Sequence, residues 1–255
     1  MLQELLPGGV FAFMLVFARI GAAMMLLPGF GEAFVSPRVR LGMALVVSFA
    51  MAPMVVGGLP PLPEGPFAAL AIIATEIGVG LFLGGAARLI LASLHVAGST
   101  IAFQAGLGFA QVFDPAQGVQ GVLVATFLTL LGVTLVFATD MHLMLLRAAF
   151  DSYPLFPPPA LPPFGDFAQL ATESVASSFK LGVQLAAPFV FYGLAFNIGL
   201  GLIARLMPAL PVFFIAVPAQ ILMAFALMAL TLSAVSISFL NGFEEGMSPF
   251  LATRR

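Results

Sequence analysis

The sequence contains no cysteine and very few charged residues, and both absences narrow what the protein can be. Without cysteine there is no disulfide, no thiol nucleophile, no iron–sulfur cluster and no cysteine-type zinc site. Charged residues make up 8% of the chain, against about 25% in ordinary globular domains. The nine Lys and Arg residues are dispersed along the chain, with only Arg254 and Arg255 adjacent, and the net charge is -2. The sequence therefore does not indicate the concentrated basic face that nucleic acid binding requires.

Sequence motifs of common enzymes are also missing. His95 and His142 are the only histidines, and there is no H-E-x-x-H motif, no G-x-S-x-G motif and no glycine-rich phosphate loop followed by Lys. We therefore predict that the protein is not an enzyme and that it holds no cofactor or metal.

Apolar residues dominate what is present: they make up 61% of the chain, and the mean hydropathy is +1.13. The stretch from Leu206 to Phe243 carries no charge. A membrane core of about 30 Å requires roughly 20 apolar residues of helix, so this stretch alone predicts a membrane protein. Arg205 precedes it, and prolines interrupt its first part, which predicts two long helices joined by a tight elbow. The elbow prolines are Pro208, Pro211 and Pro218.

The apolar stretches predict an all-α integral membrane protein built from hairpins of about six long helical segments. Their lengths are unequal, so equal perpendicular crossings are not expected. A proline-rich connection over residues 153–180 is predicted to be non-helical at its centre, with an amphipathic segment beginning near Asp166. The six segments are Leu5 to Leu27, Leu41 to Val56, Phe67 to Leu94, Gly121 to Thr139, Leu181 to Ala204 and Val212 to Leu240.

Three charged residues, Arg19, Glu76 and Arg88, lie inside apolar segments. An unpaired charge at the centre of a membrane helix costs at least ~2.5–3.5 kcal/mol, so each should face protein or water. Glu76 and Arg88 are separated by about 18 Å along a straight helix and cannot pair there. A proton or ion pathway is one interpretation. Ion pairing between helices or subunits, or a location nearer the membrane interface than segment length suggests, is the interpretation that we favour.

Small and polar residues inside the apolar segments predict close helix contacts. Glycines one turn apart let backbones approach, and amides form hydrogen bonds between helices. The glycines are Gly78, Gly80, Gly84 and Gly85, and the amides are Gln184, Asn197 and Gln220.

The stretch Gln104 to Gly121 combines glycines and a proline with bulky apolar residues such as Phe109 and Phe113. Non-helical backbone at membrane depth is tolerated only where protein buries it or where it lines a wet cavity. A re-entrant loop that plugs a pore would have this composition. An ordinary connecting loop with a few buried phenylalanines is the alternative.

Several segments together resemble the FliR family of the flagellar type III export apparatus, including its injectisome counterparts. The resemblance runs in order along nearly the whole chain. One departure is Ala209-Leu-Pro211, where the family commonly continues with Gln and Asn. The segments are Phe17–Gly21, Pro28–Phe30, Pro37–Gly42, Glu76 with the glycines that follow, Gly98 through Gln104–Gly106 to Pro115, His142 with Asp151–Pro154, and Asn197–Gly201 through Arg205 to Pro218.

The resemblance implies a core subunit of the export gate in the bacterial inner membrane and the flagellar basal body. It implies a single copy assembled with FliP and FliQ, next to FlhB, in a conduit for unfolded flagellar proteins. Residues 1–180 would be the FliP-like part and residues 181–255 the FliQ-like hairpin, with the boundary near Lys180. Such assemblies sit largely above the membrane plane, so the six segments need not be six true spans.

The resemblance also places the family's plug loop on Gln104 to Gly121, with Phe109 and Phe113 at the constriction. Glycines would supply the freedom for the plug to move. An injectisome export subunit is the near alternative. A small-solute or ion transporter using Glu76 and Arg88 is a weaker one, because the two halves show no convincing repeat. The expected plug residues are Gln104, Gly106, Gly108, Phe109, Phe113, Asp114, Pro115 and Gly118, and the expected buried or assembly charges are Arg19, Glu76, Arg88 and Arg205.

Overall fold

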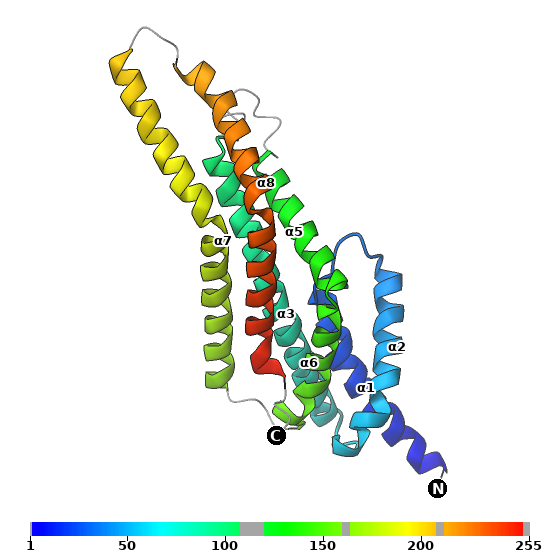
Figure 1. Cartoon of the computed structure of the whole chain (residues 1–255). Helices are drawn as coiled ribbons and strands as arrows, with labels where there is room; N and C mark the ends of the chain where they lie inside the picture. Colours follow the sequence, from blue (N-terminus) through cyan, green and yellow to red (C-terminus); the bar gives the residue numbers. More distant parts are fainter. Residues whose placement is uncertain (1, 108–119, 160–163, 208–211, 252–255) are drawn as a thin grey trace. The chain divides into compact units, whose positions relative to one another are not determined.

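The computed structural model describes residues 2–107, 120–159, 164–207 and 212–251, and every regular element among them is helical (Figure 1). This confirms the predicted all-α class. Two short 3-10 turns, Val56–Gly58 and Ser248–Phe250, accompany the long helices. The helices are α1 (Leu2–Leu26), α2 (Pro37–Val55), α3 (Pro66–Gln104), α5 (Gln120–Ala138), α6 (Met141–Leu155), α7 (Phe164–Leu206) and α8 (Val212–Met247).

Within the described ranges, five helices are long and apolar enough to cross a membrane, and a bent helix pair brings the number to six. The bent pair joins Leu123–Ala138 to Met141–Leu155 at an angle of 76°. The prediction of about six long apolar segments is thereby confirmed. Helix α6 was not among the predicted segments because Asp151 and other polar residues interrupt its apolar pattern.

Helices α3 and α7 are longer than the sequence pattern indicated. Helix α3 continues ten residues beyond Leu94 to Gln104, and α7 already begins at Phe164, so much of the predicted 153–180 connection is helical. At 1.5 Å per residue, the 39 residues of α3 extend over about 58 Å, roughly twice the hydrocarbon core. Part of such a helix must lie outside the acyl chains.

The chain divides into two compact units. The first comprises residues 1–89, 136–175 and 243–255, and the second comprises residues 90–135 and 176–242. Helices α3, α5, α7 and α8 each contribute residues to both. The FliP-like and FliQ-like parts expected from the resemblance divide the chain in another way, and their boundary near Lys180 stays a prediction.

The first unit contains the hairpin of α1 and α2, which lie side by side in Figure 1. Helix α1 also packs directly on α3. A methyl group at Gly80 would overlap the Arg19 carbonyl oxygen, and one at Gly84 would overlap that of Ala23. Both pairs rise by four residues, so the two helices run parallel with their backbones in contact, as small residues permit.

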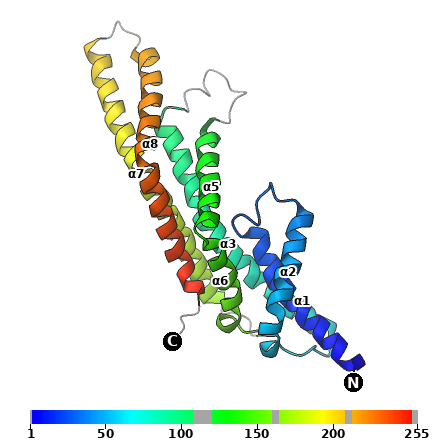
Figure 2. The ribbon, with the colours of Figure 1, turned by 45° about the vertical axis from the view of Figure 1, so that its right-hand side comes forward.

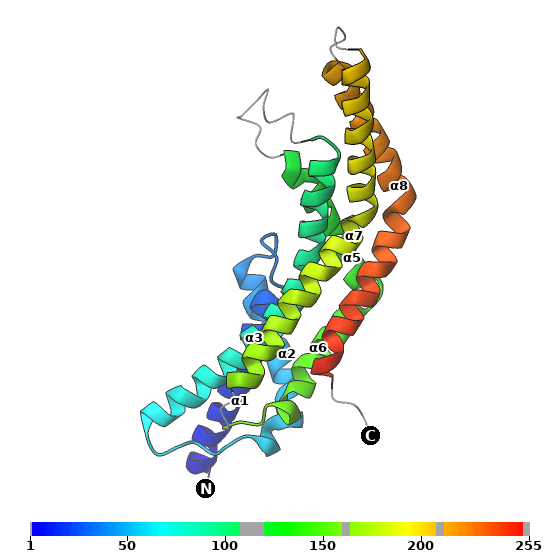
Figure 3. The ribbon, with the colours of Figure 1, turned by 90° about the vertical axis from the view of Figure 1, so that its left-hand side faces the viewer.

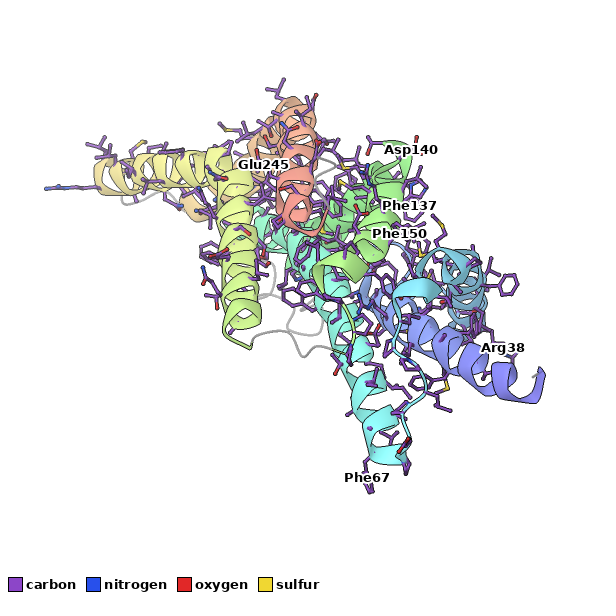
Figure 4. The ribbon with its side chains drawn as sticks, turned by 90° about the horizontal axis from the view of Figure 1, so that it is seen from below. Arg38, Phe67, Phe137, Asp140, Phe150 and Glu245 are labelled. Carbon is purple, nitrogen blue, oxygen red and sulfur yellow. The ribbon has the colours of Figure 1, made fainter. Side chains whose placement is uncertain are left out.

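The junction of α5 and α6 also lies in the first unit, where Figure 4 labels Phe137 and Asp140. Asp140 has a φ of 58°, a left-handed conformation that turns the chain sharply between the two helices. The Phe137 ring stacks on His142 with centroids 4.9 Å apart and tilts against Phe30 at 5.6 Å. The break between the helices is therefore held by aromatic packing.

The second unit contains the last part of α3 packed with α5, α7 and α8. Gly98 lies against the backbone of Ala125, and Figure 2 shows α3 and α5 side by side there. Figure 3 shows α7 running beside α8, where Gly242 faces Leu181. Gly182 lies against Ser93 in the same way. Each of these interfaces thus has a glycine that admits a larger neighbour.

The contact between α1 and α3 yields the first prediction. Gly80→Ala should destabilise the protein by about 1–3 kcal/mol, because the added methyl group must displace the α1 backbone. Gly78→Ala is the matched control, since nothing lies within 4 Å of its Cβ position. Thermal unfolding of the detergent-solubilised protein, followed by circular dichroism, compares the two. Equal melting temperatures would show that the α1–α3 contact does not limit stability.

Candidate functional site

Arg19 of α1 and Glu76 of α3 form a buried ion pair in the first unit. Their exposed fractions are 1% and 0%. The Arg19 Nε group donates to Glu76 Oε2 at 2.7 Å, and Nη2 donates to Oε1 at 2.8 Å. This two-pronged geometry is the strong form of an arginine–carboxylate pair. Arg19 and Glu76 therefore form an ion pair between α1 and α3.

The remaining N–H groups of Arg19 point at the end of α6. Nη1 donates to the main-chain oxygen of Ser152 at 3.0 Å and to its Oγ at 3.1 Å. Nη2 donates to the main-chain oxygen of Phe156 at 2.9 Å. A guanidinium has five N–H donors, and all of them are used here. The ring of Tyr153 covers the guanidinium at 4.1 Å, a cation–π contact.

The Arg19 cluster joins three helices that are distant in the sequence. The cation also meets carbonyl oxygens at the C-terminal end of α6, where the helix dipole favours positive charge. Sequence reasoning selected Arg19 and Glu76 but not Ser152 or Phe156. Their main-chain oxygens give no side-chain signal, although the segment Asp151–Pro154 contributed to the family resemblance.

Arg88 and Arg205 occupy different surroundings from Arg19. The Arg88 side chain is 47% exposed and lies 4.0 Å from Glu32. Arg205 is exposed in the last turn of α7, where a cation complements the helix dipole. The structure therefore does not bring Arg88 together with Glu76.

The predicted elbow and plug lie partly outside the described residues. Pro218 lies within α8, whereas Pro208 and Pro211 are outside the described residues. In the plug stretch the structure describes Gln104 and Gly106. The remaining predicted plug residues, which also lie outside, are Gly108, Phe109, Phe113, Asp114, Pro115 and Gly118.

Helix α3 ends in a glycine turn at the start of this stretch. Gly106 has a φ of 77°, Gly106 N–H donates to Phe103 O, and Leu107 N–H donates to Ala102 O. These two hydrogen bonds define a Schellman motif. Gln104 is thus the last residue of α3, and the chain leaves the helix axis at Gly106.

No group of three or more His, Asp or Glu residues that could hold a metal ion occurs in the part of the chain that the structure describes. Arg19, Glu76 and Ser152 are used in contacts between helices. Taken together, the long apolar helices, the satisfied buried ion pair and the glycine-based packing define a multi-helix membrane protein.

Comparison with known proteins identifies the family. The profile described as "Bacterial export proteins, family 1" matches residues 10–246, and the chain belongs to this family. The chain is similar to "Flagellar biosynthetic protein FliR" of Caulobacter vibrioides, with 39% identity over 94% of this chain and 96% of the relative. The FliR protein of Bacillus subtilis is 31% identical over 91% and 90%. "Yop proteins translocation protein T" of Yersinia pestis is 26% identical over 86% and 84%.

These similarities cover almost the full length of the chain and of its relatives. They confirm the predicted FliR family, the assignment to a membrane protein of bacterial export and the prediction that the protein is not an enzyme.

The buried ion pair yields the second prediction. Arg19→Met should lower the free energy of unfolding by about 3–5 kcal/mol, because Glu76 is left as an uncompensated buried charge. Arg147→Met is the control, since Arg147 is 56% exposed and pairs with Asp151 on its own helix, a contact worth about 0.3–0.5 kcal/mol. Denaturation of the purified proteins in detergent measures both. A loss for Arg19→Met no larger than that for Arg147→Met would contradict the role assigned to the cluster.

Proposed function

We propose that this protein is a core subunit of the flagellar type III protein export gate, in the inner membrane at the base of the flagellum. The observation that carries the proposal is the full-length similarity to FliR, at 39% identity over 94% of the chain. In this role the subunit forms part of the conduit through which unfolded flagellar proteins leave the cytoplasm. The energy for transport comes from elsewhere in the machine.

The proposed partners are FliP, FliQ and FlhB, with this subunit present as a single copy. The apolar surfaces of the helices support an assembly. On α7, Phe191 is 73% exposed and Leu194 is 60% exposed, and on α8 Leu230 is 83% exposed. Such side chains require either lipid or the helices of other subunits as neighbours. Helices α7 and α8 are too long for one bilayer crossing. Part of their apolar surface therefore lies outside the acyl chains, where partner subunits would cover it.

We further propose that the stretch Gln104 to Gly121 forms the plug of the conduit, with Phe109 and Phe113 at its narrowest point. A resting export gate must stop ions and still admit unfolded chains. Apolar side chains achieve this by excluding water until they are displaced. The left-handed Gly106 and the end of α3 at Gln104 support this proposal, because they show that the stretch leaves the helix axis at its first residues.

Transport by an injectisome is the second candidate, and the similarity to the Yersinia pestis translocation protein favours it to a lesser degree. The secondary-transporter alternative lacks support in the geometry. Both oxygens of Glu76 are bonded to Arg19, and Arg88 pairs instead with Glu32 near the surface.

The third prediction tests the flagellar role directly. An in-frame deletion should abolish motility and the secretion of hook protein and flagellin, with flagellin messenger still present, and a plasmid copy should restore all of them. Immunoblots of culture supernatants, together with swimming assays, provide the measurement. Normal secretion in the deletion strain would exclude the flagellar function and favour the injectisome candidate.

The fourth prediction tests the plug. Replacing Phe109 and Phe113 together by Ala should raise ion leak through the assembled gate, because the smaller side chains no longer exclude water from the constriction. Entry of a membrane-impermeant dye into cells reports the leak, and the membrane level of the subunit controls for assembly. Unchanged dye entry with normal assembly would count against the plug.

A further inference from the structure

The end of α3 has a main-chain oxygen, that of Gln104, that the hydrogen bonds of its own turn do not use. The Schellman bonds engage the oxygens of Ala102 and Phe103. The oxygen of Gln104, in the last turn, has no partner within the helix, as is general for helix ends. A carbonyl oxygen at a helix end that is shielded from water requires a donor from another element.

Gln220 of α8 supplies that donor. Its side chain is 3% exposed, and its Nε2 group donates to the main-chain oxygen of Gln104 at 2.9 Å. Its Oε1 atom lies against Gly106, where a Cβ atom would be only 2.9 Å away. One buried amide therefore contacts both the last residue of α3 and the glycine at which the chain turns.

Helix α7 completes this arrangement from the other side. The Tyr192 hydroxyl donates to the main-chain oxygen of Gln220 at 2.8 Å. The neighbouring Gly193 faces the Gln104 side chain, whose Oε1 would lie 2.6 Å from a Cβ at that position. All of these residues belong to the second compact unit. The end of α3 is thus fixed to both helices of the α7–α8 hairpin.

We propose that Gln220 is a positioning residue that fixes the end of α3, and with it the first residues of the Gln104 to Gly121 stretch, to the α7–α8 hairpin. The tightness of the resting gate to small solutes then depends on the hydrogen bond between Gln220 and Gln104. The inference rests on the proposed export function and adds a residue remote in sequence from the plug. In this arrangement α7 and α8 fix the position at which the Gln104 to Gly121 stretch begins.

Gln220→Met tests the inference, because methionine has nearly the size of glutamine but no donor. In the deletion strain complemented with this variant, we expect a normal membrane level of the subunit and dye entry raised roughly fivefold, the factor that the loss of one buried hydrogen bond implies. Gln184→Met is the matched control, an exposed glutamine on α7, and should leave dye entry unchanged. Dye entry at the wild-type level with Gln220→Met assembled would overturn the inference.

A disulfide distinguishes positioning from general destabilisation. The chain has no cysteine, so an introduced pair is unique. A Cβ at Gly193 would lie 3.1 Å from the Gln104 Cβ, close to the roughly 3.5–4.5 Å that disulfides require. Adding Gln104→Cys and Gly193→Cys to Gln220→Met should return dye entry to the wild-type level under mild oxidant, and a reductant should raise it again. Continued leak with the disulfide formed would overturn the positioning role.

A second variant, Tyr192→Phe, covers the case in which Gln220→Met fails to assemble. If Gln220→Met does not accumulate, Tyr192→Phe removes only the hydroxyl that holds the Gln220 main chain. Raised dye entry in that variant supports the inference, and wild-type entry contradicts it.

Secretion by the deletion strain is scored in parallel. Loss of secretion in that strain together with a tight Gln220→Met gate would reject the inference alone, whereas normal secretion in that strain would reject the proposed function and the inference together.

Discussion

A buried guanidinium is the constraint around which the first unit is arranged. Arg19 can remain charged in this apolar environment only because five acceptor contacts and one aromatic ring surround it. Those contacts come from α3 and from the end of α6. The positions of three helices are therefore linked to the geometry of a single side chain. Removing one of its partners would leave buried charged or polar groups without a hydrogen bond, which is destabilising.

Glycine has the corresponding role in the second unit. There the helices are held by close backbone approach and by the hydrogen bonds that the Gln220 amide and the Tyr192 hydroxyl donate between helices. Apolar association alone gives little specificity among helices that are apolar on all sides. The glycines and the amide instead specify which neighbours meet and in which register. This division of tasks suits a subunit whose outer faces are themselves apolar and available to partners.

Sequence reasoning predicted the helical class and the membrane character. It also singled out Arg19 and Gln220, which are buried in the structure, and Arg88, which is 47% exposed. It did so because a charge such as Arg19 or an amide such as Gln220 carries a large cost if left alone in apolar surroundings. It did not predict their partners. The acceptors are largely main-chain oxygens of Ser152, Phe156 and Gln104, which become available only where α6 and α3 end. Helix ends were also the weakest part of the prediction, because His95 to Thr100 lowers the hydropathy of α3 without ending the helix.

The parallel contact of α1 with α3 has a consequence for how the chain can change length. Carbonyl oxygens of Arg19 and Ala23 face Gly80 and Gly84, so the two backbones are matched over a full turn. Inserting or deleting one residue between Arg19 and Ala23 would rotate one of these two contacts by about 100° relative to the other. We therefore expect α1 to tolerate a change of length only outside the turn from Arg19 to Ala23.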